Sequence, residues 1–173
     1  QETQEKSENQ LIRRHESLRV VLTAAALLVL LVRTRPVLSL HAVDVGQGDG
    51  ILIQADGASI WMDGGSTDKS DVAKYQIVPL LHYYGVRKLD CCILTHEDED
   101  HRNGLAELLR NEGENGSVEI GLLLLPSVRA EEKTEGYREM EELAVEHGVP
   151  IRYLKEGDIL EQGRLRMTCL HPE

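Results

Sequence analysis

The sequence predicts an α/β fold, built from layers of strands and helices behind one apolar N-terminal helix. Residues 37–62 alternate apolar and polar side chains between glycine-rich turns, which is typical of β-strands. From residue 70 onward, short apolar runs alternate with segments of helical spacing, which favours the α/β class. The chain has 173 residues, enough for one such domain and an appendage.

The first half of the domain is predicted to open as a β-meander. Strands are expected over residues 37–44, 51–54 and 58–62, because their side chains alternate between two faces. An Asp-Gly pair at residues 56–57 marks the hairpin turn between the second and third strands. The meander ends at the Asp-Gly-Gly stretch of residues 63–65.

The remaining elements follow from apolar spacing. A helix is expected over residues 70–84, ended by Gly85 and interrupted by Pro79. The other expected elements are strands at 89–94, 118–125, 151–154 and 165–170, and helices at 103–110 and 131–148.

The N-terminal region is expected to contain a polar loop or linker at residues 1–17 and a transmembrane helix at residues 18–32. Fifteen helical residues span only about 22 Å of an apolar layer about 30 Å thick. Arg19 and Arg33 flank the apolar run and can reach toward the two interfaces. A signal peptide and a buried soluble helix stay open as alternatives.

The charge is unevenly distributed along the chain. The formal net charge is −11, from 19 basic and 30 acidic residues. Residues 1–36 hold six of the basic and four of the acidic residues, so the rest carries 13 and 26, a net charge of −13. So acidic a domain is poorly suited to bind a nucleic-acid backbone through bulk electrostatics. The three cysteines form no CxxC pair and indicate no disulfide framework.

The segment most suggestive of chemistry is Thr-His-Glu-Asp-Glu-Asp-His at residues 95–101. It follows the apolar run at 89–94 and combines imidazole nitrogens with carboxylate oxygens, a donor set that suits a divalent metal. In an extended segment His96 and Asp98 point the same way, whereas Asp100 and His101 follow where the chain turns. The alternative is a solvated acidic loop.

This segment resembles the His-x-His-x-Asp-His signature of the metallo-β-lactamase fold, with Asp98 in place of the second histidine. The version followed by Gly-Leu is similar to the metal domain of ComEC-type DNA-uptake (competence) proteins. Residues 41–54 (HAVDVGQGDGILIQ) and 60–65 (IWMDGG) also resemble that family, and the resemblance covers residues 18–173. It implies the αββα layers of that fold over residues 37–173, mainly their first half, preceded by the last membrane helix.

The resemblance also implies site residues. His96 and Asp98 would hold a first metal, Asp100 and His101 a second, and Asp63 would orient these ligands by hydrogen bonds. Catalytic roles fall on Asp100 and Asp63. The further expected members are His171, as an additional metal ligand or an ordinary loop residue, Asp44, Gln47 and Asp49, as site lining or as a capped turn, and Gly64, as site lining. The expected cofactor is manganese or zinc, with one ion here and two in a complete domain.

The resemblance implies a metal-dependent hydrolase acting on DNA phosphodiesters during uptake. The expected partners are an imported single DNA strand, the membrane and other parts of the competence channel, with the metal domain on the extracytoplasmic side of the cell membrane. The family continues with a metal-bridging Asp and a further His, so the domain is expected to be C-terminally incomplete and inactive alone. Two alternatives stay open, a non-catalytic membrane-anchored fragment and a hydrolase of a small ester or lactone.

Overall fold

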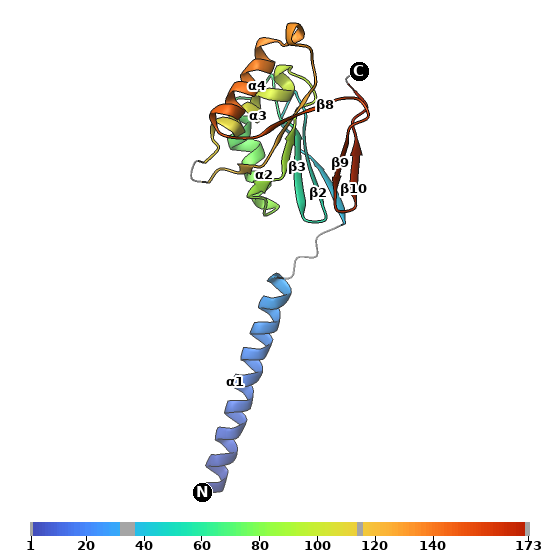
Figure 1. Cartoon of the computed structure of the whole chain (residues 1–173). Coiled ribbons are helices and arrows are strands. Elements are labelled where there is room, and N and C mark those ends of the chain that lie inside the picture. The colour runs from blue at the N-terminus through green and yellow to red at the C-terminus, as the bar shows by residue number, and fades with distance from the viewer. Residues whose placement is uncertain (1, 32–36, 114–115, 172–173) are drawn as a thin grey trace. The chain divides into compact units, whose positions relative to one another are not determined.

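The structure is a computed structural model that describes residues 2–31, 37–113 and 116–171 (Figure 1). The chain divides near residue 35 into two compact units, which are described separately.

The N-terminal unit is one helix, α1 (Glu2–Leu31). Residues 2–17, for which a polar loop was expected, are therefore helical, and residue 1 lies outside the described residues. In the part of the chain that the structure describes, no helix has an apolar stretch long enough to cross a membrane. The transmembrane helix expected over 18–32 is thus not found there, and residue 32 is not described.

The second unit is built on a six-stranded mixed sheet with the order β1-β2-β3-β5-β7-β8. The strands β1, β2 and β3 pair antiparallel, as the predicted meander requires, and β3, β5, β7 and β8 pair parallel. Their bounds are Leu38–Ala42, Gly50–Ala55, Ala58–Asp63, Cys91–Ile93, Leu123–Pro126 and Ile151–Leu154. The α/β class is confirmed.

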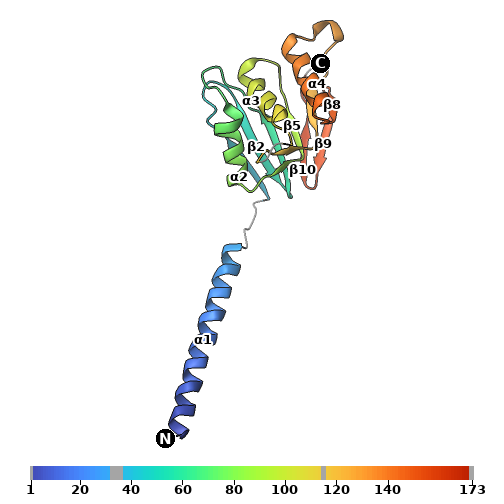
Figure 2. The same cartoon turned by 90° about the vertical axis from the view of Figure 1, so that its left-hand side faces the viewer.

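The helices and the β9–β10 hairpin lie on opposite sides of this sheet. Figures 1 and 2 show α2, α3 and α4 on one face and the β9–β10 hairpin on the other. The helical elements are a π-helical turn η1 (Ala73–Ile77), α2 (Val78–Tyr83), α3 (Glu99–Arg110), a 3-10 turn η2 (Ala130–Glu132) and α4 (Glu135–Glu146). The minor sheets pair β4 (Lys88–Leu89) with β6 (Glu119–Ile120) and β9 (Ile159–Gln162) with β10 (Leu165–Thr168).

Each face of the sheet has its own apolar core, because successive side chains of a strand point to opposite faces. Trp61, Cys92 and Leu123 belong to the core under the helices, whereas Ile60 and Cys91 belong to the core under the β9–β10 hairpin. Burial raises the pKa of the Cys91 thiol to about 11. The adjacent cysteines therefore serve as small apolar core residues, one for each face.

Several predicted elements differ in extent from the observed ones. The helix expected at 103–110 begins at Glu99, so the second half of the acidic segment is its first turn. Pro79 occupies the first turn of α2, where a missing N–H costs no helical hydrogen bond, and the preceding turn is π-helical. The strand expected at 118–125 is divided between β6 and β7, and β9 was not predicted.

An ion pair fixes the β9–β10 hairpin to the main sheet. Asp56, in the turn between β2 and β3, accepts a hydrogen bond from the Arg164 backbone N–H (2.6 Å) and one from its guanidinium (2.9 Å). The hydrogen bonds from Arg164 hold the pKa of Asp56 below its ordinary value. The contact joins segments 108 residues apart in sequence, so it constrains where the hairpin lies on the sheet.

We expect Arg164→Ala to loosen the hairpin, measured as faster amide exchange in β9 and β10 at neutral pH. The matched control is Arg166→Ala, which removes an exposed pair within the same hairpin (Arg166 Nε to Glu161 Oε1, 3.6 Å) and should change exchange much less. Because the pKa of Asp56 is lowered in the folded state, its contribution is present above the ordinary aspartate pKa and is lost as the pH falls through the folded-state value. Equal exchange in Arg164→Ala and the unmodified chain would contradict this role.

Candidate functional site

The candidate site lies where three connecting segments meet, at the carboxyl ends of the parallel strands β3 and β5. These segments are the β1–β2 connection, the stretch after β3, and the stretch from β5 into α3. The carboxyl ends of parallel strands are where open α/β sheets bind ligands, because the connections there diverge and leave room. The sheet topology therefore brings Asp49, Asp63 and the acidic segment to one edge.

Asp63 is the buried centre of this edge. It is 5% exposed and is the last residue of β3, with a φ of 56°. Its carboxylate accepts hydrogen bonds from the Thr95 N–H (2.8 Å), the Thr95 hydroxyl (2.8 Å) and the ring nitrogen Nδ1 of His101 (3.1 Å). Its main-chain carbonyl accepts from the Trp61 indole N–H. A positive φ costs an aspartate less than most residues, and these contacts hold the backbone there.

These hydrogen bonds fix the tautomers of two histidines. As a carboxylate, Asp63 can only accept, so His101 carries its proton on Nδ1. Thr95 gives its one hydroxyl hydrogen to Asp63, so its oxygen accepts from Nδ1 of His96 (3.0 Å). In the neutral form of each ring, Nε2 is then the nitrogen without a proton and is free to act as a ligand.

Carboxylates lie near Nε2 of both histidines. Nε2 of His101 lies 3.7 Å from Asp100 Oδ2 and 3.9 Å from Asp49 Oδ2. Nε2 of His96 lies 3.5 Å from Asp98 Oδ2, and the two histidine rings have centroids 3.8 Å apart. The structure therefore brings together His96, Asp98, Asp100, His101, Asp63 and Asp49, each of which the sequence predicted as a site residue.

The donors suit a divalent ion chemically but are not closed around one. Within residues 2–31, 37–113 and 116–171, no three histidine, cysteine, aspartate or glutamate side chains are arranged to hold a metal. Two ligands at about 2.1 Å from one ion lie about 3.0–3.4 Å from each other, somewhat closer than the distances around His101. The Asp49 and Asp100 side chains are 69% and 40% exposed, so rotation about their own bonds can close these gaps. The chemistry of the donor set therefore suits a divalent ion, although the described side chains do not form a closed site around one.

The remaining predicted site residues have other surroundings. Asp44 accepts from the Gly46 N–H (3.1 Å) and pairs with Lys69 (3.2 Å), and the Lys69 ammonium holds the pKa of Asp44 below its ordinary value. Asp44 therefore acts as the turn cap that was its alternative role. His171 is exposed after β10, and in the described part of the chain no recorded contact joins its ring to the other site residues.

Glycines let the three segments touch through their backbones. A Cβ added at Gly48 would overlap the Gly65 and Asp100 carbonyls, and one added at Gly104 would overlap the carbonyl of Gly64. The Asp49 N–H donates to the Asp100 carbonyl (3.2 Å), which joins the β1–β2 connection to α3. Gly64 thus contributes a close backbone approach to α3, and the Gln47 carbonyl accepts from the Thr67 N–H (2.9 Å), which joins the β1–β2 connection to the segment after β3.

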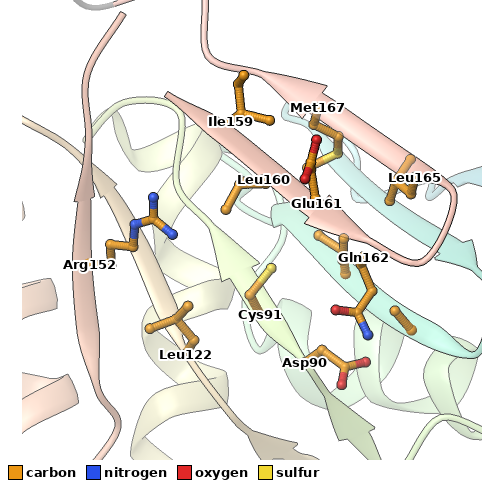
Figure 3. A pocket seen from close by; sticks show the side chains of 12 residues that line it. Asp90, Cys91, Leu122, Arg152, Ile159, Leu160, Glu161, Gln162, Leu165 and Met167 are labelled. Atoms are coloured by element: carbon orange, nitrogen blue, oxygen red, sulfur yellow. The ribbon is translucent and has the colours of Figure 1, made fainter. Parts of the chain in front are cut away.

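The site is distinct from a cavity of about 240 Å³ between the main sheet and the β9–β10 hairpin (Figure 3). Its lining includes Cys91, Arg152 and Met167, and contains none of the predicted site residues. The cavity belongs to the core under the hairpin rather than to the edge that carries Asp63.

Comparison with known proteins relates the chain to much longer relatives. It is 28% identical over 145 residues to "ComE operon protein 3" of Bacillus subtilis, covering 76% of this chain and 18% of that protein. It is 32% identical over 92 residues to "Recombination protein 2" of Haemophilus influenzae, covering 53% of this chain and 12% of that protein. It is 37% identical over 71 residues to the uncharacterized protein YcaI of Escherichia coli, covering 40% of this chain and 9% of that protein. The chain therefore spans less than a fifth of each relative.

No family model matches the chain. Among solved structures, a diphosphatase of the PhnP family aligns with a TM-score of 0.46 and 18% identity, over 70% of this chain and 42% of that one. This likeness is too weak to establish the fold.

We expect Asp63→Asn to release the His101 ring from its fixed tautomer. An asparagine has one acceptor oxygen in place of two and cannot satisfy all three donors that Asp63 now holds. Nitrogen-15 NMR should show Nδ1–H for His101 in the unmodified chain and a mixture of tautomers in the variant. Asp90→Asn is the matched control, because the Asp90 carboxylate accepts from the Ser59 N–H (2.7 Å), outside the site. A His101 that keeps Nδ1–H in Asp63→Asn would contradict this account.

Proposed function

We propose that residues 37–173 form part of a metal-dependent hydrolase domain, of the metallo-β-lactamase type, in a DNA-uptake protein. The observation that carries the proposal is the orientation of His101, whose Nδ1 is held by buried Asp63 and whose Nε2 faces Asp49 and Asp100. The relative named "ComE operon protein 3" supports the connection with the ComEC-type proteins that the acidic segment resembles.

A divalent ion at this position, manganese or zinc, supplies Lewis-acid chemistry that acidifies water and stabilises negative charge on a phosphoryl oxygen. The carboxylates of Asp98 and Asp100 together with the two histidines favour an ion that accepts oxygen as well as nitrogen ligands. Asp63 holds His101 in place, and the Asp100 carboxylate, 3.7 Å from Nε2, would accept a proton from the attacking water.

We propose a phosphodiester of a single DNA strand as the substrate. A net charge of −13 on residues 37–173 repels a polyanion, so the strand would have to be guided by parts of the uptake machinery outside this chain. We further propose that these parts lie in the cell membrane and that the metal domain is extracytoplasmic, as the resemblance implies.

The test is a pair of measurements on the chain. Isothermal titration with Mn²⁺ and with Zn²⁺ should show one site, and His101→Ala should weaken it at least tenfold because the ring is the best-oriented donor. His147→Ala is the matched control, since His147 follows α4 and lies outside the site. Unchanged affinity in His101→Ala would contradict the proposal.

The second measurement is cleavage of single-stranded DNA, duplex DNA and a small ester, with and without a chelator. Cleavage of single-stranded DNA that the chelator abolishes would support the proposal. Hydrolysis of the ester alone would overturn the proposed substrate. Binding of metal without any cleavage would favour the non-catalytic alternative.

A further inference from the structure

The side chain of Asn103, on α3, forms two hydrogen bonds with the main chain of Ser66, in the segment that follows β3. Its side-chain Nδ2–H donates to the Ser66 carbonyl (2.6 Å), and its Oδ1 accepts from the Ser66 N–H (2.9 Å). Both main-chain polar groups of one residue are thus bound by one side-chain amide, as a neighbouring strand would bind them. Ser66 is 1% exposed, so without Asn103 these two groups would be buried without partners.

The hydrogen-bond network continues from Ser66 through the Asp68 side chain to the β1–β2 connection. The Ser66 hydroxyl donates to Asp68 Oδ1 (2.8 Å), and the same oxygen accepts from the Gln47 N–H (2.7 Å). The Thr67 N–H donates back to the Gln47 carbonyl (2.9 Å). Hydrogen bonds from the Gln47 N–H and the Ser66 hydroxyl hold the pKa of Asp68 below its ordinary value.

This chain of contacts ends two residues before Asp49. The glycines at the interface, Gly48 and Gly65, bring the backbones into contact but have no side chains that could fix their register. On the side toward α3, one recorded backbone hydrogen bond, from the Asp49 N–H to the Asp100 carbonyl at 3.2 Å, joins the connection to the helix. The network running from Asn103 through Ser66 to Asp68 therefore adds a side-chain constraint on where Asp49 stands relative to His101, beside the backbone pairing of Gly50 with Asp63.

We propose that Asn103 and Asp68 are positioning residues, which hold the Asp49 carboxylate against Nε2 of His101 through Ser66 and Gln47. The inference rests on the proposed function in assuming that Asp49 and His101 act together on one ion. Neither Asn103 nor Asp68 touches that ion in this account. Both act by placing a ligand that does, in the way that outer hydrogen bonds tune metal sites.

The experiment compares Mn²⁺ affinity in Asn103→Ala, Asp68→Ala and Asp68→Asn by isothermal titration. The two alanine variants should bind about 10-fold to 100-fold more weakly. Asp68→Asn should retain most of the affinity, because an amide oxygen still accepts from Gln47 and Ser66 although the charge is gone. Asn111→Ala, at the other end of α3, is the matched control for the same residue type.

The double variant Asn103→Ala, Asp68→Ala tests whether the two residues affect metal affinity through one shared network or independently. If both residues act through Ser66, the double variant loses little more affinity than the weaker-binding single variant. Full additivity, or an Asp68→Asn variant as weak as Asp68→Ala, would overturn the inference and indicate loss of negative charge instead.

Amide chemical shifts measured without metal test the positioning role independently of metal binding. Asn103→Ala should shift the Asp49 and His101 amides while thermal unfolding remains cooperative. If the unmodified chain binds no metal but these amides shift, the proposed function fails and the positioning network stands. If the unmodified chain binds metal and both affinity and shifts are unchanged in the variants, the positioning role is wrong. Should Asn103→Ala not fold, the Asp68→Ala and Asp68→Asn pair decides, since neither variant alters α3.

Discussion

The site depends on one buried carboxylate at the end of a strand. Asp63 leaves β3 with a positive φ, and its two oxygens accept from Thr95, which follows β5, and from His101 on α3. Nδ1 of His101 donates to Asp63 and Nδ1 of His96 donates to the Thr95 hydroxyl, so Nε2 is the nitrogen that each ring leaves outside these bonds. The main sheet matters to the chemistry chiefly because the parallel pairing of β3 with β5 brings Asp63 within reach of Thr95.

Close backbone packing between the connecting segments brings Asp49 to the site. Glycines at the three segments allow carbonyls and amides to meet where any side chain would overlap them, so Asp49 can approach Asp100 and His101. The cost of such packing is concentration of acidic groups at one edge of an already acidic domain. A divalent cation would relieve that repulsion as well as supply chemistry, which ties the binding of an ion to the stability of the fold.

Much of the fold and of the candidate site could be predicted from the sequence. The predictions that were wrong or missing have physical causes. The α/β class and the acidic segment were predicted because strand alternation and donor composition are local properties. Residues 2–17 were misjudged because their sequence shows no apolar periodicity, although Glu, Gln and Lys favour helices. β9 was missed because Ile159–Gln162 is short and pairs only with β10. The hydrogen bonds between Asn103 and Ser66 join residues 37 apart in sequence, and no local sequence pattern predicts them.

The most direct test of the central claim is the position of a bound ion in a crystal grown with Zn²⁺, located by anomalous scattering at the zinc edge. The account predicts one peak about 2.0–2.2 Å from Nε2 of His101, with Asp49 or Asp100 as a further ligand and Nδ1 still bonded to Asp63. A peak bound through Nδ1 of His101, or an ion held only by Asp98 and other exposed carboxylates, would contradict it.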